Sequence, residues 1–417
     1  MRNLVCPIKV SSLILLLPVV VACDARVDTS KTWNRHTIDN SSLGADGART
    51  ADVNGDGLPD IVTGWEQGGV SRIYLMEREE GSLPNWIQVD AGPAPSVEDA
   101  LLVDLDQDGA IDVVSSTEGQ NMKMLVHWAP PPGSDYTDSS LWKTETLFED
   151  GSRWMFAVRM DIDGKNGPDL VIAGKGKGGT IGWLESPANP RHISQWKFHP
   201  LTPITWIMSV ILEDVDADGL LDVLVSDRKG KQDGVFWLKN PGKGSVDLRN
   251  PWEKNWIADD LYETNFIALH DFNSDGNKEV VVPHKKGDKQ GLLSILEHEK
   301  GVLQRRISIN LPASLSVPKA VSVADINLDG KMDAILSTEG ATDGRSGVVW
   351  LSYSKSWDSP DWKAHDISGP EGIKFDLNLM LDLDDDGDLD VINTEEANNA
   401  RGGKAGLGLI WYENPYK

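Results

Sequence analysis

One acidic pattern, DxDxDGxxD, recurs seven times along the chain, with Asn at position 3 or Glu at position 9 in some copies. In a tight turn the side chains at positions 1, 3 and 5 converge, and the glycine at position 6 tolerates the left-handed backbone that reverses the chain. A single copy is typical of an ordinary aspartate turn, but seven copies indicate a loop that binds a cation. The copies start 52 to 57 residues apart, at Asp52, Asp104, Asp161, Asp214, Asp271, Asp325 and Asp382.

Six copies have oxygen-bearing side chains at positions 1, 3, 5 and 9. With a backbone carbonyl near position 7, this set resembles the loop of an EF-hand without its helices, and oxygen-only ligation favours Ca²⁺ over Zn²⁺ or copper. We therefore expect about six bound Ca²⁺ ions as cofactors. The expected metal ligands are Asp52, Asn54, Asp56 and Asp60; Asp104, Asp106, Asp108 and Asp112; Asp214, Asp216, Asp218 and Asp222; Asp271, Asn273, Asp275 and Glu279; Asp325, Asn327, Asp329 and Asp333; and Asp382, Asp384, Asp386 and Asp390.

The third copy departs from the pattern. Asp161 and Asp163 are followed by Lys165 at position 5 and Asn166 at position 6. An ammonium a few ångströms from a divalent cation costs Coulomb energy. We therefore expect no ion in this loop, and we expect Lys165 to hold it internally.

The segments around each loop predict how it is positioned. A short apolar stretch precedes each loop and another follows it, and two further segments marked by tryptophans complete the repeat, all reading as strands. Four antiparallel strands in each of seven repeats predict an all-β fold, a seven-bladed β-propeller, in which radial closure protects the strand edges. The seventh repeat lacks its fourth strand before Lys417, and Trp33 to Ile38 form an orphan strand. We expect this N-terminal strand to complete the last blade.

The acidic loops on this strand pattern resemble the FG-GAP or VCBS repeat family, the calcium-bearing propellers of integrin α heads, fungal lectins and secreted bacterial proteins. The resemblance covers nearly all of residues 32–417, the predicted propeller domain. It implies the fold and the metal sites strongly and an activity only weakly, since the family serves adhesion, sugar binding and scaffolding. The third segment of a repeat carries a tryptophan and often ends in Asn-Pro, as at Trp237 to Pro241. Fungal aldos-2-ulose dehydratases share this pattern, and ulvan lyases also include seven-bladed propellers.

The first 23 residues have the pattern of a secretory signal. Arg2 and Lys9 flank a polar start, residues 10–21 are almost wholly apolar, and Val20 to Cys23 resemble a bacterial lipobox. We expect Cys23 to be lipidated and residues 24–31 to form a tether, which places the protein in the cell envelope, periplasmic or at the cell surface, with membrane contact through the anchor only. A plain cleaved signal with an incidental cysteine is the alternative.

Composition excludes several function classes. Forty basic and 65 acidic side chains give a formal charge of −25, which disfavours nucleic-acid binding. Two cysteines leave no disulfide framework. The sequence also lacks a Walker loop, a GxSxG elbow and an HExxH helix.

We expect a ligand to bind on the face opposite the acidic loops, where segments enter first strands and leave second strands. Basic residues and aromatic rings gather in those segments, which suggests an anionic ligand, such as an acidic polysaccharide, held by charge and stacked on rings. The alternative is that the lysines solvate the surface and the rings cap the core. The ligand-binding candidates are Trp154, Lys175, Lys177, Trp206, Arg228, Lys229, Phe266, Lys286 and Phe375.

The same face carries residues for an alternative function as a polysaccharide lyase or sugar dehydratase. In a lyase, Arg153, Arg228 or Lys285 would neutralise a uronate, and Tyr262 or His284 would serve as the base. No motif of a particular lyase family accompanies them, so whether the protein is an enzyme stays open. A protein-binding scaffold is the third hypothesis.

Removal of calcium should destabilise the protein, because ions that bind only the folded state add to its free energy of unfolding. We expect excess chelator to lower the melting temperature by several degrees, and added Ca²⁺ to restore it. An unchanged melting curve would count against occupied loops.

Lipidation depends on a single thiol. We expect cells fed a labelled lipid precursor to label the wild-type protein but not Cys23→Ala. Label retained in the variant would rule out Cys23 as the acceptor.

Overall fold

The computed structural model describes residues 19–22, 27–28, 32–230, 233–286, 290–359, 362–396 and 406–416. Their regular structure is β-strand apart from two 3₁₀ turns, Ser139–Leu141 and Ile193–Gln195. None of the helices in these ranges is long and apolar enough to span a membrane. Cys23, most of the predicted signal and most of the tether lie outside the described residues.

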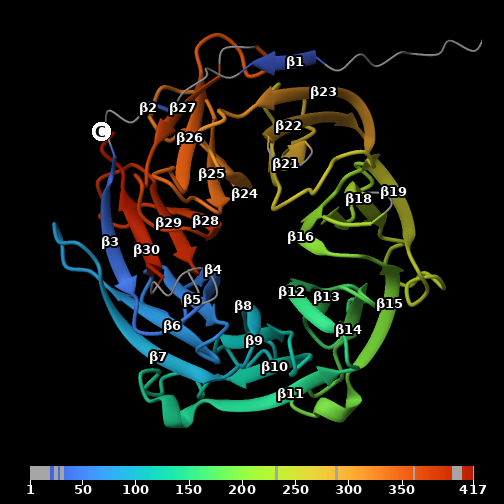
Figure 1. The fold of residues 1–417 in the computed structure, drawn as a ribbon. Helices are drawn as coiled ribbons and strands as arrows, with labels where there is room; N and C mark the ends of the chain where they lie inside the picture. The colour runs from blue at the N-terminus through green and yellow to red at the C-terminus, as the bar shows by residue number, and fades with distance from the viewer. Residues whose placement is uncertain are drawn as a thin grey trace, which may run out of the picture.

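The strands form seven antiparallel sheets arranged as a ring, which confirms the predicted seven-bladed β-propeller (Figure 1). In each blade the first strand lies nearest the hub and the fourth lies at the rim. Blades 1 to 3 are β4 (Ala45–Ala51), β5 (Asp60–Trp65), β6 (Val70–Glu77) and β7 (Asn85–Pro93); β8 (Val97–Val103), β9 (Asp112–Thr117), β10 (Lys123–Trp128) and β11 (Lys143–Glu149); and β12 (Arg153–Met160), β13 (Asp169–Lys175), β14 (Thr180–Glu185) and β15 (Lys197–Pro203). Blades 4 to 6 are β16 (Ile207–Glu213), β17 (Asp222–Asp227), β18 (Gly234–Lys239) and β19 (Glu253–Ala258); β20 (Ala268–His270), β21 (Glu279–Lys286), β22 (Gln290–Glu299) and β23 (Val302–Asn310); and β24 (Val317–Ala324), β25 (Asp333–Glu339), β26 (Val348–Tyr353) and β27 (Trp362–Asp366). Blade 7 is β28 (Phe375–Leu381), β29 (Asp390–Glu395), β30 (Gly408–Glu413) and β3 (Asn34–Asp39).

The N-terminal strand closes the ring, as the sequence predicts. β3 pairs antiparallel with β30, with Arg35 opposite Tyr412 and His36 opposite Trp411. The last blade therefore contains strands from both ends of the chain. Two shorter strands, β1 (Val19–Ala22) and β2 (Val27–Asp28), add in parallel to the outer strands of blades 5 and 6.

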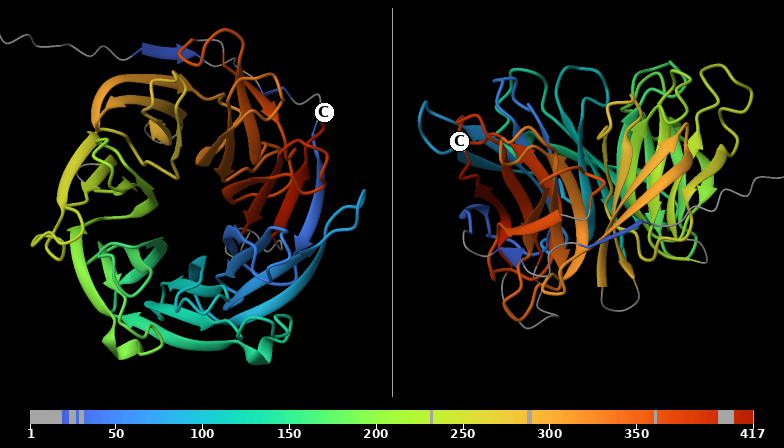
Figure 2. Two further views of the ribbon diagram at one scale, coloured as in Figure 1. Left: turned by 180° about the vertical axis from the view of Figure 1, so that it is seen from behind. Right: turned by 90° about the horizontal axis from the view of Figure 1, so that it is seen from above.

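The blades stand side by side around the hub (Figure 2), and the hydrophobic core lies between the faces of neighbouring blades. Second strands such as β5 and β9 are buried along their whole length, because a neighbouring blade covers each of their two faces. One core cluster brings together Ile38 of β3, Ile61 and Tyr74 of blade 1, and Trp411 of blade 7. Packing of this kind holds each blade to the next around the hub.

Ile38 should be important for closing the ring, because it is 7% exposed within the cluster between blades 7 and 1. We expect Ile38→Ala to lower the free energy of unfolding by about 2 to 4 kcal/mol, the usual cost of truncating a core isoleucine. Urea denaturation measures the change. The matched control is Val302→Ala, also on a rim strand but 63% exposed, which should change stability by less than about 0.5 kcal/mol. Equal effects of the two substitutions would contradict this role for Ile38.

Candidate functional site

Six of the seven acidic loops share one backbone arrangement. The glycine at position 6 has a positive φ, for example 87° at Gly57 and 93° at Gly109. Its amide donates a hydrogen bond to the carboxylate at position 1, as Gly57 does to Asp52 at 2.9 Å. The same bond recurs in loops 2, 4, 5, 6 and 7. The sequence pattern therefore specifies a single turn geometry.

The side chains of these loops fit a cation. Carboxylate oxygens of Asp104, Asp106 and Asp108 lie within 4.8 Å of one another, as do those of the corresponding residues of loop 4. Oδ1 of Asp104, of Asp216 and of Asp384 is buried and accepts no hydrogen bond. A buried carboxylate oxygen without a donor is costly, and a hard divalent ion offers the missing partner.

The carboxylates at position 9 have a structural role that the sequence analysis missed. Asp60 accepts the backbone amides of Val53, at position 2 of the loop, and of Met76, in the third strand, at 2.7 and 2.8 Å. The corresponding bonds recur in blades 2, 3, 4 and 7. Burial raises the pKa of these carboxyls, to about 8 for Asp112. Each oxygen has a second lone pair, so the same residue can also face an ion.

The third loop is neutralised by a neighbouring blade, and the expectation that Lys165 holds it is wrong. Lys243 Nζ lies 2.8 Å from Asp161, and Arg249 lies 2.9 Å from Asp163. Lys165 is exposed and contributes its backbone amide to Asp163. Both cations come from blade 4, about 80 residues away in sequence, so a local motif does not reveal them.

In each of loops 2 and 4, a side-chain cation reaches two carboxylates. Arg191 contacts Asp106 and lies 3.3 Å from Asp108. Lys239 contacts Asp216 and lies 2.7 Å from Asp218. An ion in loop 2 or loop 4 would therefore compete with a side-chain cation for the carboxylates. Among the described residues, loops 1 and 5 have no such cation.

A cavity of about 420 Å³ occupies the mouth of the central channel, on the opposite face from the acidic loops. Residues at the starts of first strands and the ends of second strands line it, as the sequence analysis expects for the ligand face. All seven blades contribute. Deeper in the channel, a second cavity of about 340 Å³ is lined mostly by aliphatic side chains such as Val210, Ala320 and Val321. The mouth is thus polar and the throat beneath it is largely apolar.

Most cations at the channel mouth are paired with carboxylates of other blades. Lys175 Nζ lies 3.0 Å from Glu98 and 2.8 Å from Glu118. Arg228 lies 3.0 Å from Glu339. Two of the predicted ligand-binding cations, Lys175 and Arg228, are therefore neutralised in the structure.

Blades 6 and 7 continue this charge network. Lys319 Nζ lies 3.8 Å from Glu339 and 3.7 Å from Asp376, and Lys374 contacts Glu396. Burial alone would raise the pKa of Glu339, but attraction to Lys319 and Arg228 outweighs it and holds the pKa at about 2. Glu339 is therefore a fixed negative charge between two cations.

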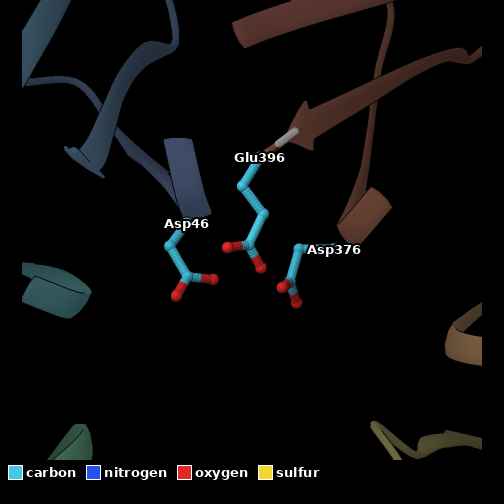
Figure 3. A group of neighbouring side chains, drawn as sticks. All are labelled: Asp46, Asp376 and Glu396. Atoms are coloured by element: carbon cyan, nitrogen blue, oxygen red, sulfur yellow. The ribbon is translucent and has the colours of Figure 1, made fainter. Parts of the chain in front are cut away.

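Three carboxylates converge on one side of the mouth. Oxygens of Asp46, Asp376 and Glu396 lie within 4.8 Å of one another, and the three side chains point toward a common space (Figure 3). Burial, with repulsion from Asp376 and Glu98, raises the pKa of Asp46 well above its usual value.

The predicted aromatic residues divide into two groups. Trp206 and Phe266 line the cavity, but Phe266 is only 6% exposed, whereas Trp206 is partly exposed. Lys175 and Lys229 lie 4.9 and 3.8 Å from the centroid of the Trp206 ring. Trp154 and Phe375, in contrast, are fully buried in the core. Their rings cannot stack on a ligand. For these two residues the alternative interpretation, that the rings cap the core, is confirmed.

The candidate residues for lyase chemistry do not gather at the cavity. Tyr262 is 64% exposed and His284 is buried, and neither lines the channel mouth. Burial, the largest cause, lowers the pKa of His284 to about 4, and its Nε2 lies 2.8 Å from Ser294 Oγ. Lys285 lies 2.8 Å from Glu263. Arg153 and Lys177 are exposed outside the lining, and the side chain of Lys286 is outside the described part of the structure.

Sequence reasoning missed several residues of the channel mouth. Asp46, Glu98, Lys319 and Asp376 all line the cavity. Each lies near the start of a first strand, so the same argument that selected Trp206 and Phe266 would have found them. A further hollow of about 510 Å³ beside Asn166 is lined by residues of blade 3 alone.

Comparisons with known proteins agree with this architecture. Residues 52–115, which hold the first two acidic loops, match the model of the FG-GAP-like repeat. No curated protein sequence matches the chain.

Three solved structures illustrate the similarity in fold. BBS1N in complex with ARL6DN has a TM-score of 0.50 at 13% identity, with 93% of this chain and 98% of that chain covered. The Dos1 propeller has a TM-score of 0.48 at 9% identity, covering 93% and 95%. AofleA from Arthrobotrys oligospora has a TM-score of 0.40 at 12% identity, covering 84% and 96%. At 13% identity, the similarity to BBS1N indicates a shared fold and says nothing of function. The chain is a seven-bladed β-propeller in which residues 52–115 match the FG-GAP-like repeat.

Proposed function

We propose that the protein is a binding module that holds its ligand at the mouth of the central channel. The observation that carries this proposal is the cavity itself, which has a charged lining beside the partly exposed ring of Trp206. Its volume of about 420 Å³ is within the range of small-molecule sites. The apolar throat beneath it favours recognition at the mouth.

A carbohydrate is the ligand class that we favour. Sugars present an apolar ring face and a rim of hydroxyls, and the mouth offers the ring of Trp206 next to many hydrogen-bonding side chains. Acidic polysaccharides were the first candidate from the sequence. The pairing of Lys175 and Arg228 with carboxylates means that a purely anionic chain would have to displace existing ion pairs.

We also propose that the acidic loops bind Ca²⁺ and stabilise the propeller. The converging carboxylates and the buried oxygens without donors support this role. A bound divalent cation would favour the charged form of the carboxyls at position 9, whose pKa burial raises. Anchoring through Cys23 and a location in the cell envelope remain predictions from the sequence.

A protein ligand at the same face is the second candidate. The solved structure of BBS1N contains a partner, ARL6DN, so a propeller of this kind can serve as a protein-binding scaffold. The lyase or dehydratase alternative has less support, because Tyr262 and His284 do not line the cavity.

Trp206 provides the test of the binding site. We expect oligosaccharides that bind the wild-type protein in calorimetry to bind Trp206→Ala at least about fivefold more weakly, because removal of an aromatic anchor at a binding site typically costs more than about 1 kcal/mol. Trp206→Phe keeps a ring at this position and should retain most of the affinity.

The control is Tyr262→Ala, an exposed aromatic residue outside the cavity, which should bind like the wild type. Equal affinity of Trp206→Ala and wild type would contradict binding at the channel mouth. Appearance of unsaturated products, followed by absorbance near 235 nm with uronate polymers, would instead favour the lyase alternative.

A further inference from the structure

The charges of the channel mouth are divided between two sides of the ring. Among the described lining residues, blades 7, 1 and 2 contribute six carboxylates and one lysine, whereas blades 3 to 6 contribute four cations and one carboxylate. Blades 7, 1 and 2 are consecutive, since β4 contacts both β28 and β8. The cavity therefore has an acidic wall and a basic wall that face each other.

Ion pairs neutralise the two seams between these walls. Lys175 of blade 3 pairs with Glu98 and Glu118 of blade 2. At the other seam, Lys319 of blade 6 lies 3.7 Å from Asp376 of blade 7. These pairs hold neighbouring blades together, and they leave the groups farther from the seams to meet a ligand.

On the acidic wall, Asp46 and Glu66 have no ion-pair partner among the described residues. Asp46 is half-buried and shares its space with Asp376 and Glu396 (Figure 3). Glu66 accepts a hydrogen bond from the neighbouring Gln67. This wall holds more carboxyl groups than cations. Burial and repulsion raise the pKa of Asp46, and a cationic group of a ligand would favour its charged form.

On the basic wall, Lys229 has no ion-pair partner within the described part of the chain. Its ammonium lies 3.8 Å from the centroid of the Trp206 ring, and Glu263 feels its charge without forming an ion pair with it. Lys229 is exposed and can therefore turn toward a ligand. An anionic group beside Trp206 would find an unpaired ammonium and an aromatic ring together.

From this division we infer that the ligand is a doubly charged saccharide, with an ammonium group against Asp46 and an acidic group against Lys229. This inference rests on the proposed function of the channel mouth as a saccharide site. A sugar with a single charge compensates one wall and leaves the opposite wall without a counterion. A sugar with both charges compensates both walls, and each charged hydrogen bond to an unpaired group adds affinity.

A panel of four pyranoses tests the inference by calorimetry on the full chain in calcium-containing buffer. Glucose, glucosamine, glucuronate and glucosamine 6-sulfate share one ring and differ in charge. We expect glucosamine 6-sulfate to bind at least about tenfold more tightly than either singly charged sugar, since one charged hydrogen bond is worth about 1.5 to 3 kcal/mol.

Two near-isosteric variants separate the walls. Asp46→Asn should abolish the advantage of glucosamine 6-sulfate over glucuronate, and Lys229→Gln should abolish its advantage over glucosamine. Lys177→Gln removes an exposed lysine outside the lining and should leave all four affinities unchanged. Melting curves of the variants confirm that each is folded.

The outcomes distinguish this inference from the proposed function. Binding of the sugars without preference for the doubly charged one, or a preference that survives Asp46→Asn and Lys229→Gln, would overturn the inference and leave the saccharide site intact. Failure of all four sugars and of longer oligosaccharides to bind would overturn both this inference and the proposed saccharide site.

Discussion

Closure of the ring is the constraint on which the rest of this structure depends. Each blade buries its faces against two neighbours, so a blade at an open end would leave one apolar face in water. The last blade is completed by β3 from the other end of the chain, and Ile38 of that strand packs against both blade 7 and blade 1. Because residues from all seven blades line the channel mouth, the cavity exists only in the closed ring.

Carboxylates perform three different tasks in this fold, and their surroundings decide which. At positions 1, 3 and 5 of the loops they converge and leave buried oxygens without donors. At position 9 they accept backbone amides and join the loop to the third strand. At the channel mouth they pair with lysines and arginines of other blades. The first arrangement is the one on which our proposal of Ca²⁺ binding mainly rests, although all three use the same residue types.

The two ends of the channel differ in a way that suits a propeller with a binding role. The acidic loops are the turns between first and second strands, and they lie on one face. The opposite face is built from the other ends of the same strands, so a ligand there meets side chains that the sheets hold in place.

The sequence by itself determined the number of blades, the acidic turns, the closing strand and the face that carries the cavity, because local spacing and strand periodicity encode these features. Only the tertiary structure decided which side chains are available at that face. Trp154 and Phe375 are buried where neighbouring sheets meet. Arg228 is neutralised by Glu339, 111 residues away, and loop 3 by Lys243 and Arg249. Contacts between blades join residues far apart in the chain, and a repeated local pattern does not specify which of them meet.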